Sequence, residues 1–377
     1  MELKEDAFRR WGEQRNESWF VRHMHLDVPL VLALFALSIT GLAVLYSAGN
    51  QDLDIVYRQI VRIGLAFAAM LMIAQIPPDK LKRWSPWLAG LGIILLIAVA
   101  IVGDVGKGAQ RWLDFGLFRF QPAEIMKLAL PMLLAWYLAE RKLPPSLKHL
   151  AVSAFLIAIP VVLIAKQPDL GTSILIASCG IFVIFLAGIS WRLMFFLGAV
   201  FASCLPLAWL YMHDYQKTRV LTFLNPESDP LNSGYHIIQS KIAIGSGGFY
   251  GKGFLQGTQS HLEFLPERST DFIFAAFAEE LGLVGALLLL ALYLFIVIRG
   301  LVIATQAQDT YTRLLAGSLT LTFFVYVFVN IGMVSGLLPV VGLPLPLMSY
   351  GGTSMVTIMA AFGVLMSIHT HRKMIRN

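Results

Sequence analysis

The sequence predicts an all-α polytopic membrane protein with about ten transmembrane helices, and three observations support this fold class. Hydrophobic residues make up 57% of the 377 residues and charged residues only 14%, whereas soluble domains are about half apolar and about a quarter charged. The apolar residues gather in runs of about 20, the length that crosses a bilayer as a helix. Most basic residues lie in the short connections between these runs, so the net charge of +6 does not indicate a nucleic-acid partner.

Ten apolar segments are long enough to span a membrane. The fourth is unusual because it contains Glu124 and Lys127, and the tenth is rich in Gly, Ser and Thr. The first is longer than the apolar core of a cleaved signal peptide, which runs to about 15 residues, so we expect a retained helix. The predicted spans are 28–48, 55–76, 84–103, 121–139, 149–165, 170–188, 192–212, 272–298, 314–336 and 350–369.

The distribution of basic residues predicts the orientation of the chain. With residues 1–27 placed in the cytoplasm, the inside segments hold 17 Lys and Arg residues and the short outside loops hold 4. This asymmetry is the one that the positive-inside rule describes. An even number of spans then places both termini in the cytoplasm. We expect residues 1–377 to form a single integral membrane domain, because no segment has the composition of a soluble domain.

One outside connection, residues 213–270 between the seventh and eighth spans, is much longer than the others. Long loops in compact proteins are usually functional. Residues 235–244 have the pattern of an amphipathic helix at the membrane interface. The glycine-dense stretch 245–257 is no P-loop, because Gly253 rather than Ser or Thr follows Lys252. We therefore expect a backbone turn and no nucleotide there; a nest of N–H groups facing a lipid phosphate is the alternative.

Ionisable side chains at membrane depth tend to face a cavity or a partner. Glu124 and Lys127 share one face of the fourth span because they are three residues apart. They either form a local ion pair or line a polar cavity together with Arg111 and Arg119, which precede them in the same outside connection. In the second case, the three cations and the carboxylate of Glu124 would lie near the outer surface, where they would suit a bound diphosphate.

Two aspartates stand immediately before predicted spans. Asp271 precedes the eighth span and Asp169 the sixth, positions where an acidic residue ordinarily stabilises the start of a helix. Glu279 and Glu280 follow Asp271 by eight and nine residues, which on a straight helix is about 12–14 Å deeper and on other faces. We therefore expect both glutamates to pack against neighbouring polar groups, outside the site of Asp271.

Residues 336–354 are unlike a membrane helix. They contain three prolines and four glycines in 19 residues, which excludes a regular spanning helix. Irregular backbone near a membrane must be buried in protein or line a cavity. The sequence therefore predicts a re-entrant or tightly packed outside loop.

The same segment carries the signature of a known family. Asn330 and the stretches 336–339, 342–343 and 349–354 resemble the signature of the SEDS family (shape, elongation, division and sporulation proteins). The likeness runs from His25 to Lys373, and its motifs are most similar to the elongation branch of the family. The further motifs are 107–113, 120–125, 167–173, 212–216, 225–230, 235–248 and 264–268.

This resemblance implies a peptidoglycan glycosyltransferase in the cytoplasmic (inner) membrane of a bacterium. Members of the family polymerise lipid II on the extracytoplasmic side into β-1,4 glycan strands, with inversion and with undecaprenyl diphosphate as leaving group. The elongation branch maintains rod shape, in a complex with a class B penicillin-binding protein that crosslinks the strands. The expected partners are therefore lipid II, the growing glycan, this transpeptidase, other elongation-complex components and membrane lipids.

The chemistry that the resemblance implies assigns roles to named residues. A diphosphate leaves as an anion, so the reaction needs one base for the acceptor hydroxyl and cations for the departing charge. The family's essential aspartate maps onto Asp271, and Arg111 and Lys127 are candidate diphosphate partners, helped by Mg²⁺ or Mn²⁺. A helix N-terminus would weaken Asp271 as a base, so it is either a desolvated base or a metal ligand. The other expected substrate-binding residues are Glu124, Asp169 and Ser349.

Two other functions fit the physics of the sequence. A lipid II flippase would also need many spans and polar groups at depth. Against it, the motif-like residues gather on the outside face, and the sequence shows no inverted repeat of the kind that alternating access favours. The third possibility is a non-enzymatic scaffold for the penicillin-binding protein.

Overall fold

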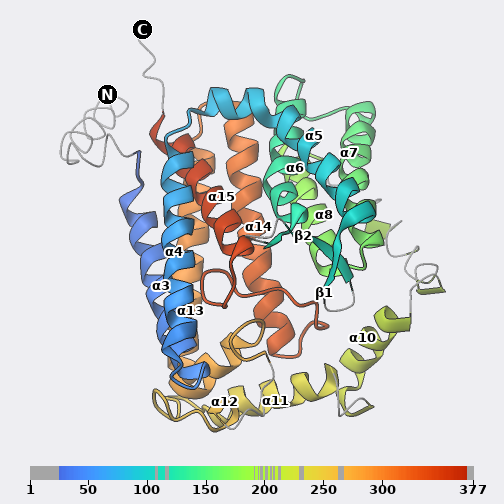
Figure 1. Ribbon diagram of the computed structural model, residues 1–377. Helices are drawn as coiled ribbons and strands as arrows, with labels where there is room; N and C mark the ends of the chain where they lie inside the picture. Colours follow the sequence, from blue (N-terminus) through green and yellow to red (C-terminus); the bar gives the residue numbers. More distant parts are fainter. Residues whose placement is uncertain are drawn as a thin grey trace.

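The computed structural model describes residues 25–371, apart from 107–108, 115–118, most positions between 191 and 213, 229–232 and 262–266. The described residues form a bundle of long helices (Figure 1). The chain enters and leaves at one end of the bundle, where the rings of His25 and His371 stack with centroids 3.9 Å apart. We call this end the terminal face. The opposite end, the loop face, carries α10 (Asp214–Leu224), α11 (Ser233–Ser246) and α12 (Thr258–His261).

The predicted spans are confirmed as helices wherever the structure describes them. Among the described residues, eight helices are long and apolar enough to cross a membrane, and α8 is a shorter apolar helix. The seventh predicted span, 192–212, lies largely outside the described residues. The helices are α3 (Val28–Ala48), α4 (Leu53–Ala74), α5 (Pro78–Val102), α6 (Pro122–Ala139), α7 (Leu147–Lys166), α8 (Leu170–Leu186), α13 (Ile273–Thr305), α14 (Thr310–Val334) and α15 (Thr353–Thr370).

Both chain ends of the described part lie on the terminal face, as an even number of spans requires. Helix α14 is the central element, in contact with α6, α8, α11, α13 and α15. Helices α3, α4, α5 and α7 present many large apolar side chains outward, which is the surface that a lipid environment needs. The protein is therefore a multi-pass membrane protein. That the terminal face is cytoplasmic stays a prediction from the charge bias.

Two helices differ from the apolar runs that predicted them. Helix α5 begins at Pro78 rather than near residue 84 and contains Pro86; its first turns run across the terminal face before the helix turns along the bundle (Figure 1). Helix α13 is broken at Gly282, which has φ 65° and ψ −163°. The break follows Glu279 and Glu280, so the chain changes direction beyond them. Hydropathy marks where apolar residues lie but carries no information on a break in backbone direction.

A small sheet interrupts the helical architecture between α5 and α6. Strands β1 (Asp104–Gly106), β2 (Ala109–Asp114) and β3 (Arg119–Phe120) pair antiparallel in the order β1-β2-β3. The predicted all-α fold did not include this sheet, because the strands are too short to show a period-2 pattern. It sits toward the loop face and carries Arg111.

The glycine-dense stretch after α11 packs onto the break in α13. The backbone N–H groups of Lys252 and Gly253 donate to the carbonyls of Glu279 and Glu280, each at 3.0 Å. A Cβ at Gly282 would lie 2.3 Å from the backbone nitrogen of Gly251, so only glycine permits this approach. The expected backbone turn is confirmed.

Polar partners also account for the two glutamates before the break. Lys252 Nζ lies 2.7 Å from Glu279 Oε1, which also accepts from the backbone N–H of Gln259 at 2.9 Å. Ser47 on α3 donates to Glu280. The expectation that both glutamates pack against polar groups is confirmed, and they serve to hold the outside segment onto the bundle.

Candidate active site

Asp271 stands in a turn held by residues 336–352, which we call the buried loop. Helix α13 begins two residues later, at Ile273, so Asp271 precedes the helix rather than lying in its first turn. The Asn330 side-chain amide on α14 donates to the Asp271 carbonyl oxygen at 2.9 Å. A Cβ built on Gly342 would lie 3.5 Å from Asp271 Oδ2, so the half-buried carboxylate faces this glycine. The predicted irregular, protein-packed loop is confirmed.

Ser349 fixes the backbone immediately before Asp271. Its hydroxyl donates to the Thr270 carbonyl oxygen at 2.6 Å and accepts from the Leu345 backbone N–H at 2.8 Å. The next residue, Tyr350, donates its backbone N–H to the Ser269 carbonyl at 2.8 Å. The buried Ser349 hydroxyl is thus engaged within the protein. Its predicted contact with substrate stays a prediction, and the geometry makes it a positioning residue for Asp271.

Arg111 and Asp169 form a second cluster on the loop face. Arg111 Nη2 donates to the Pro168 carbonyl at 2.8 Å, and its Nε lies 3.6 Å from Asp169 Oδ2. Asp169 caps α8 by accepting from the Thr172 backbone N–H at 3.1 Å, and it also accepts from Gln121 at 3.3 Å. The helix-start role of Asp169 is confirmed. Arg111 remains about a third exposed, so part of its guanidinium is available to an anion.

Glu124 and Lys127 form a buried ion pair on α6. Lys127 Nζ lies 2.6 Å from Glu124 Oε1, with both side chains less than a tenth exposed. The ammonium also lies over the ring of Tyr326 on α14, 5.1 Å from its centroid. Tyr326 in turn packs against Leu343 of the buried loop. The side chain of Arg119, expected beside this pair, lies outside the described residues.

The buried loop contacts both the turn that holds Asp271 and the cluster of Arg111 and Asp169. Its Val341 carbonyl oxygen would lie 2.8 Å from a Cβ on Gly171, in the first turn of α8, whereas its neighbour Gly342 faces Asp271. Two successive loop residues therefore contact the helix start that Asp169 caps and the turn that holds Asp271. The expected local ion pair of Glu124 and Lys127 is present, and Arg111 lies beside Asp169 instead of joining that pair.

The sequence analysis missed a cationic group on α4. Buried Gln59 donates to the Ser349 carbonyl oxygen at 3.2 Å, and the Arg62 guanidinium lies over the Tyr350 ring, 4.3 Å from its centroid. The sequence did contain an indication of this cation. Arg58 and Arg62 stand one helical turn apart inside a predicted span, where arginines are rare and tend to face interior sites. Arg62 is thus a further cation beside the segment that holds Asp271.

A histidine of the outside segment borders the same turn. His236 on α11 stacks on Phe272, with ring centroids 5.6 Å apart. Burial in this contact lowers the pKa of His236 below its ordinary value of 6.5, and the carboxylate of Glu267 opposes this only in part. The neutral imidazole is therefore the form that the folded loop face accommodates.

The donor set around Asp271 fits a cation shared with substrate. Among the described residues, no group of three or more His, Cys, Asp or Glu side chains could hold a metal ion alone. Mg²⁺ ordinarily binds through one or two carboxylates together with substrate phosphates and water. The half-buried carboxylate of Asp271 could supply the protein's share of such a site.

These features define a multi-pass membrane protein with a polar site at the loop-face ends of its helices. The family model described as cell cycle protein, FtsW/RodA/SpoVE, matches residues 21–374. The chain is 56% identical to the peptidoglycan glycosyltransferase MrdB of Escherichia coli, over 96% of this chain and 98% of the relative. It is 32% identical to the peptidoglycan glycosyltransferase RodA of Treponema pallidum, over 92% and 98%.

Solved structures agree with this assignment. A chain from a peptidoglycan synthase complex that coordinates polymerization and crosslinking matches with a TM-score of 0.80 and 31% identity, over 92% of this chain and 99% of that chain. The rod shape determining protein RodA of Thermus thermophilus matches with a TM-score of 0.71 and 30% identity, over 92% and 98%. The chain belongs to the FtsW/RodA/SpoVE family. The predicted resemblance to the SEDS family and its elongation branch is confirmed.

Proposed function

We propose that this peptidoglycan glycosyltransferase polymerises lipid II at its loop face, with Asp271 as the essential acidic group. The enzyme class rests on the full-length relatives. The observation that supports the site is the placement of Asp271: its turn is held from both sides by Asn330 and Ser349, and its carboxylate faces a glycine that leaves room beside it. A carboxylate positioned in this way by buried groups is preorganised for one reaction geometry.

The proposed chemistry needs one proton transfer. The acceptor hydroxyl attacks the anomeric carbon of the donor sugar from the face opposite the diphosphate. The new C–O bond forms as the bond to the diphosphate oxygen breaks, which inverts the configuration. The hydroxyl proton passes to the Asp271 carboxylate, and the diphosphate leaves as an anion that needs no proton. If Asp271 instead holds a divalent cation, its role would be to place that charge beside the departing diphosphate, and the hydroxyl proton would pass to water or to a substrate oxygen.

The departing charge requires cations, and the loop face offers several. Arg111 is the most accessible of the predicted ones, because its guanidinium is partly exposed while it is held by Pro168 and Asp169. Lys127 is enclosed with Glu124, so its proposed contact with the diphosphate would require this ion pair to separate. Arg62 adds a third cation beside Tyr350.

The proposed setting is the inner membrane of a bacterium, with the loop face outside. The charge bias of the sequence supports this orientation, and the loop face carries the long segment 214–261 and the Asp271 turn. The proposed partner is a class B penicillin-binding protein that crosslinks the strands. It is supported by the similarity to a chain of a peptidoglycan synthase complex that couples polymerization to crosslinking.

The test is polymerisation of lipid II by the purified protein, alone and with its cognate penicillin-binding protein whose transpeptidase has been inactivated. Each reaction is run with Mg²⁺, with Mn²⁺ and with chelator. Long glycan supports the proposal, and a requirement for the partner would add activation to it. Folded protein that moves lipid II across vesicles but makes no glycan under any of these conditions would replace the proposal with the flippase.

A further inference from the structure

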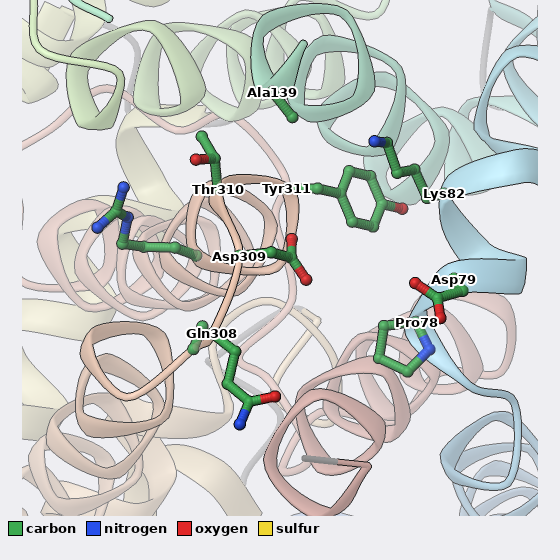
Figure 2. A pocket seen from close by; sticks show the side chains of 10 residues that line it. Pro78, Asp79, Lys82, Ala139, Gln308, Asp309, Thr310 and Tyr311 are labelled. Carbon is green, nitrogen blue, oxygen red and sulfur yellow. The ribbon is translucent and has the colours of Figure 1, made fainter. Parts of the chain in front are cut away.

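A polar cavity of about 440 Å³ opens at the terminal face, far from the Asp271 turn. Its volume falls in the range of small-molecule pockets, about 300–1,000 Å³. The first turn of α5, the last turn of α6 and the connection from α13 to α14 enclose it (Figure 2). Because three separate parts of the chain meet there, the cavity is a product of the fold rather than a gap beside one loop.

The lining of this cavity carries charge of both signs. Asp79 and Asp309 contribute carboxylates, and Lys82 and Arg313 contribute cations. Figure 2 shows the carboxylates of Asp79 and Asp309 on either side of one open space, with Lys82 and Tyr311 on another side of it. A purely anionic ligand would meet two carboxylates, and a purely cationic one would meet two cations. A ligand that carries both charges can contact lining groups of both signs.

The groups of the cavity are fixed by bonds outside it. The Tyr311 hydroxyl is 3.0 Å from Ser85 Oγ on α5, and its ring is buried. Asp309 caps α14 by accepting from the Thr312 backbone N–H at 2.9 Å, which fixes the direction of its carboxylate. At the rim, Lys82 lies 3.4 Å from Glu140 at the end of α6. Tyr311 and Asp309 are therefore held in a set geometry.

The cavity lies at the level of the membrane surface. Trp84 and Trp87, on the same stretch of α5 that lines it, are 51% and 81% exposed. Exposed tryptophans on a membrane protein mark the interface between headgroups and acyl chains. The first turns of α5 run across the end of the bundle rather than along it (Figure 1), as a helix lying in that interface does.

We propose that this cavity binds the headgroup of a zwitterionic phospholipid that carries a primary ammonium, the chemistry of phosphatidylethanolamine. Lys82 and Arg313 would attract the phosphate, and the ammonium would donate hydrogen bonds to Asp79 and Asp309. A choline headgroup offers no N–H donor to those carboxylates, and a glycerol headgroup offers no cation. The bound lipid would join the start of α5 to the α13–α14 connection.

The test measures lipid bound to the full-length protein after delipidation in detergent. Native mass spectrometry counts phosphatidylethanolamine, phosphatidylcholine and phosphatidylglycerol added in equal amounts, and thermal unfolding reports the stabilisation by each. Arg313→Gln and Asp79→Asn remove one charge of each sign, and Arg313→Lys restores a cation. Lys80→Gln is the matched control, because Lys80 lies on the same exposed turn of α5 but outside the cavity lining.

We expect phosphatidylethanolamine to be retained in preference to the other two lipids. Arg313→Gln and Asp79→Asn should each weaken this retention about two- to fivefold, the effect of losing one partly exposed charge pair, while Lys80→Gln and Arg313→Lys keep it. Equal retention of the three lipids would overturn the proposal, as would an equal loss in Lys80→Gln. Displacement of the lipid by inorganic phosphate or glycerophosphoethanolamine at equal concentration would show a soluble ligand instead.

Discussion

Gly342 lies directly against the carboxylate of Asp271: a Cβ at this glycine would stand 3.5 Å from Asp271 Oδ2. The glycine also has φ +75°, a backbone conformation that other residues rarely adopt. The buried loop therefore turns at the point where it meets the acid, and the turn leaves open space where a side chain would be. The loop that carries the family signature therefore lines the space beside the Asp271 carboxylate, where the proposed reaction takes place.

We expect Gly342→Ala to lower the polymerisation rate more than it lowers stability. The substitution costs about 1–2 kcal/mol for the positive φ and places a methyl group against the Asp271 carboxylate, in the space that substrate needs. Gly248→Ala is the matched control: Gly248 has φ +55°, but no atom lies within 4 Å of its Cβ position. Similar unfolding midpoints with a rate loss only in Gly342→Ala would support the account, whereas equal rates in the two variants would contradict it.

Ser349→Ala should lower kcat for glycan synthesis while changing KM little. The variant loses the hydrogen bond to the Thr270 carbonyl, worth about 0.5–1.5 kcal/mol, and so loosens the turn that positions Asp271. Steady-state kinetics on lipid II separates the two constants. Ser335→Ala removes a comparable hydroxyl-to-carbonyl bond at the end of α14 and should leave both constants unchanged. A rise in KM alone would instead make Ser349 a direct substrate ligand.

Lys127→Ala should destabilise the protein by about 3–5 kcal/mol, because it leaves Glu124 buried without its partner. The paired change Glu124→Gln with Lys127→Met should cost much less, since neither variant side chain then carries a buried charge. Thermal unfolding in detergent measures both. If the double variant is stable but uses lipid II poorly, the pair acts in the reaction as well as in the fold. Equal stability of Lys127→Ala and wild type would refute the buried ion pair.

The loop face should lose stability as the pH falls below about 6.5. The folded state holds the pKa of His236 below its unfolded value of 6.5, so between the two values the unfolded chain binds more protons. The contribution of His236 to the free energy of unfolding is therefore fully present above pH 6.5, and it declines as the pH falls toward the pKa of the folded state. Unfolding midpoints across this range should show the decline in wild type and in His149→Gln, a change remote on α7, but less of it in His236→Gln. An unchanged decline in His236→Gln would assign the effect elsewhere.

Much of the architecture could be predicted because each membrane span is a long apolar run in the sequence. About 20 apolar residues per helix are hard to miss, and the irregular loop was evident from its prolines and glycines. The positions of Asp271 and Asp169 just before helix starts also followed from local signals. The breaks in direction did not, because Gly282 in α13 and Pro86 in α5 lie inside predicted spans, and hydropathy carries no information on backbone direction.

The pairing of side chains was less predictable than their positions. Arg111 precedes Glu124 and Lys127 closely in sequence, and proximity suggested one shared cluster. In the structure β2 directs Arg111 toward Asp169 at the start of α8 instead. Such a contact joins residues 58 apart, and it depends on how β2 and the start of α8 pack together. Arg62 was missed for another reason: its charge was visible inside a span, but its aromatic partner Tyr350 lies far along the chain.

The central claim is that Asp271 carries the glycan-forming reaction, and an isosteric change tests it most directly. Lipid II polymerisation should be compared between wild type and Asp271→Asn, each purified with the inactivated partner and matched in unfolding midpoint. Asparagine keeps the shape of the side chain, the Asn330 hydrogen bond to the carbonyl of residue 271 and the Ser349 hydrogen bond to the Thr270 carbonyl. It carries no negative charge with which to accept the hydroxyl proton or to attract a cation. We predict long glycan from wild type and none from the folded variant. Wild-type rates of glycan synthesis from folded Asp271→Asn would contradict the account.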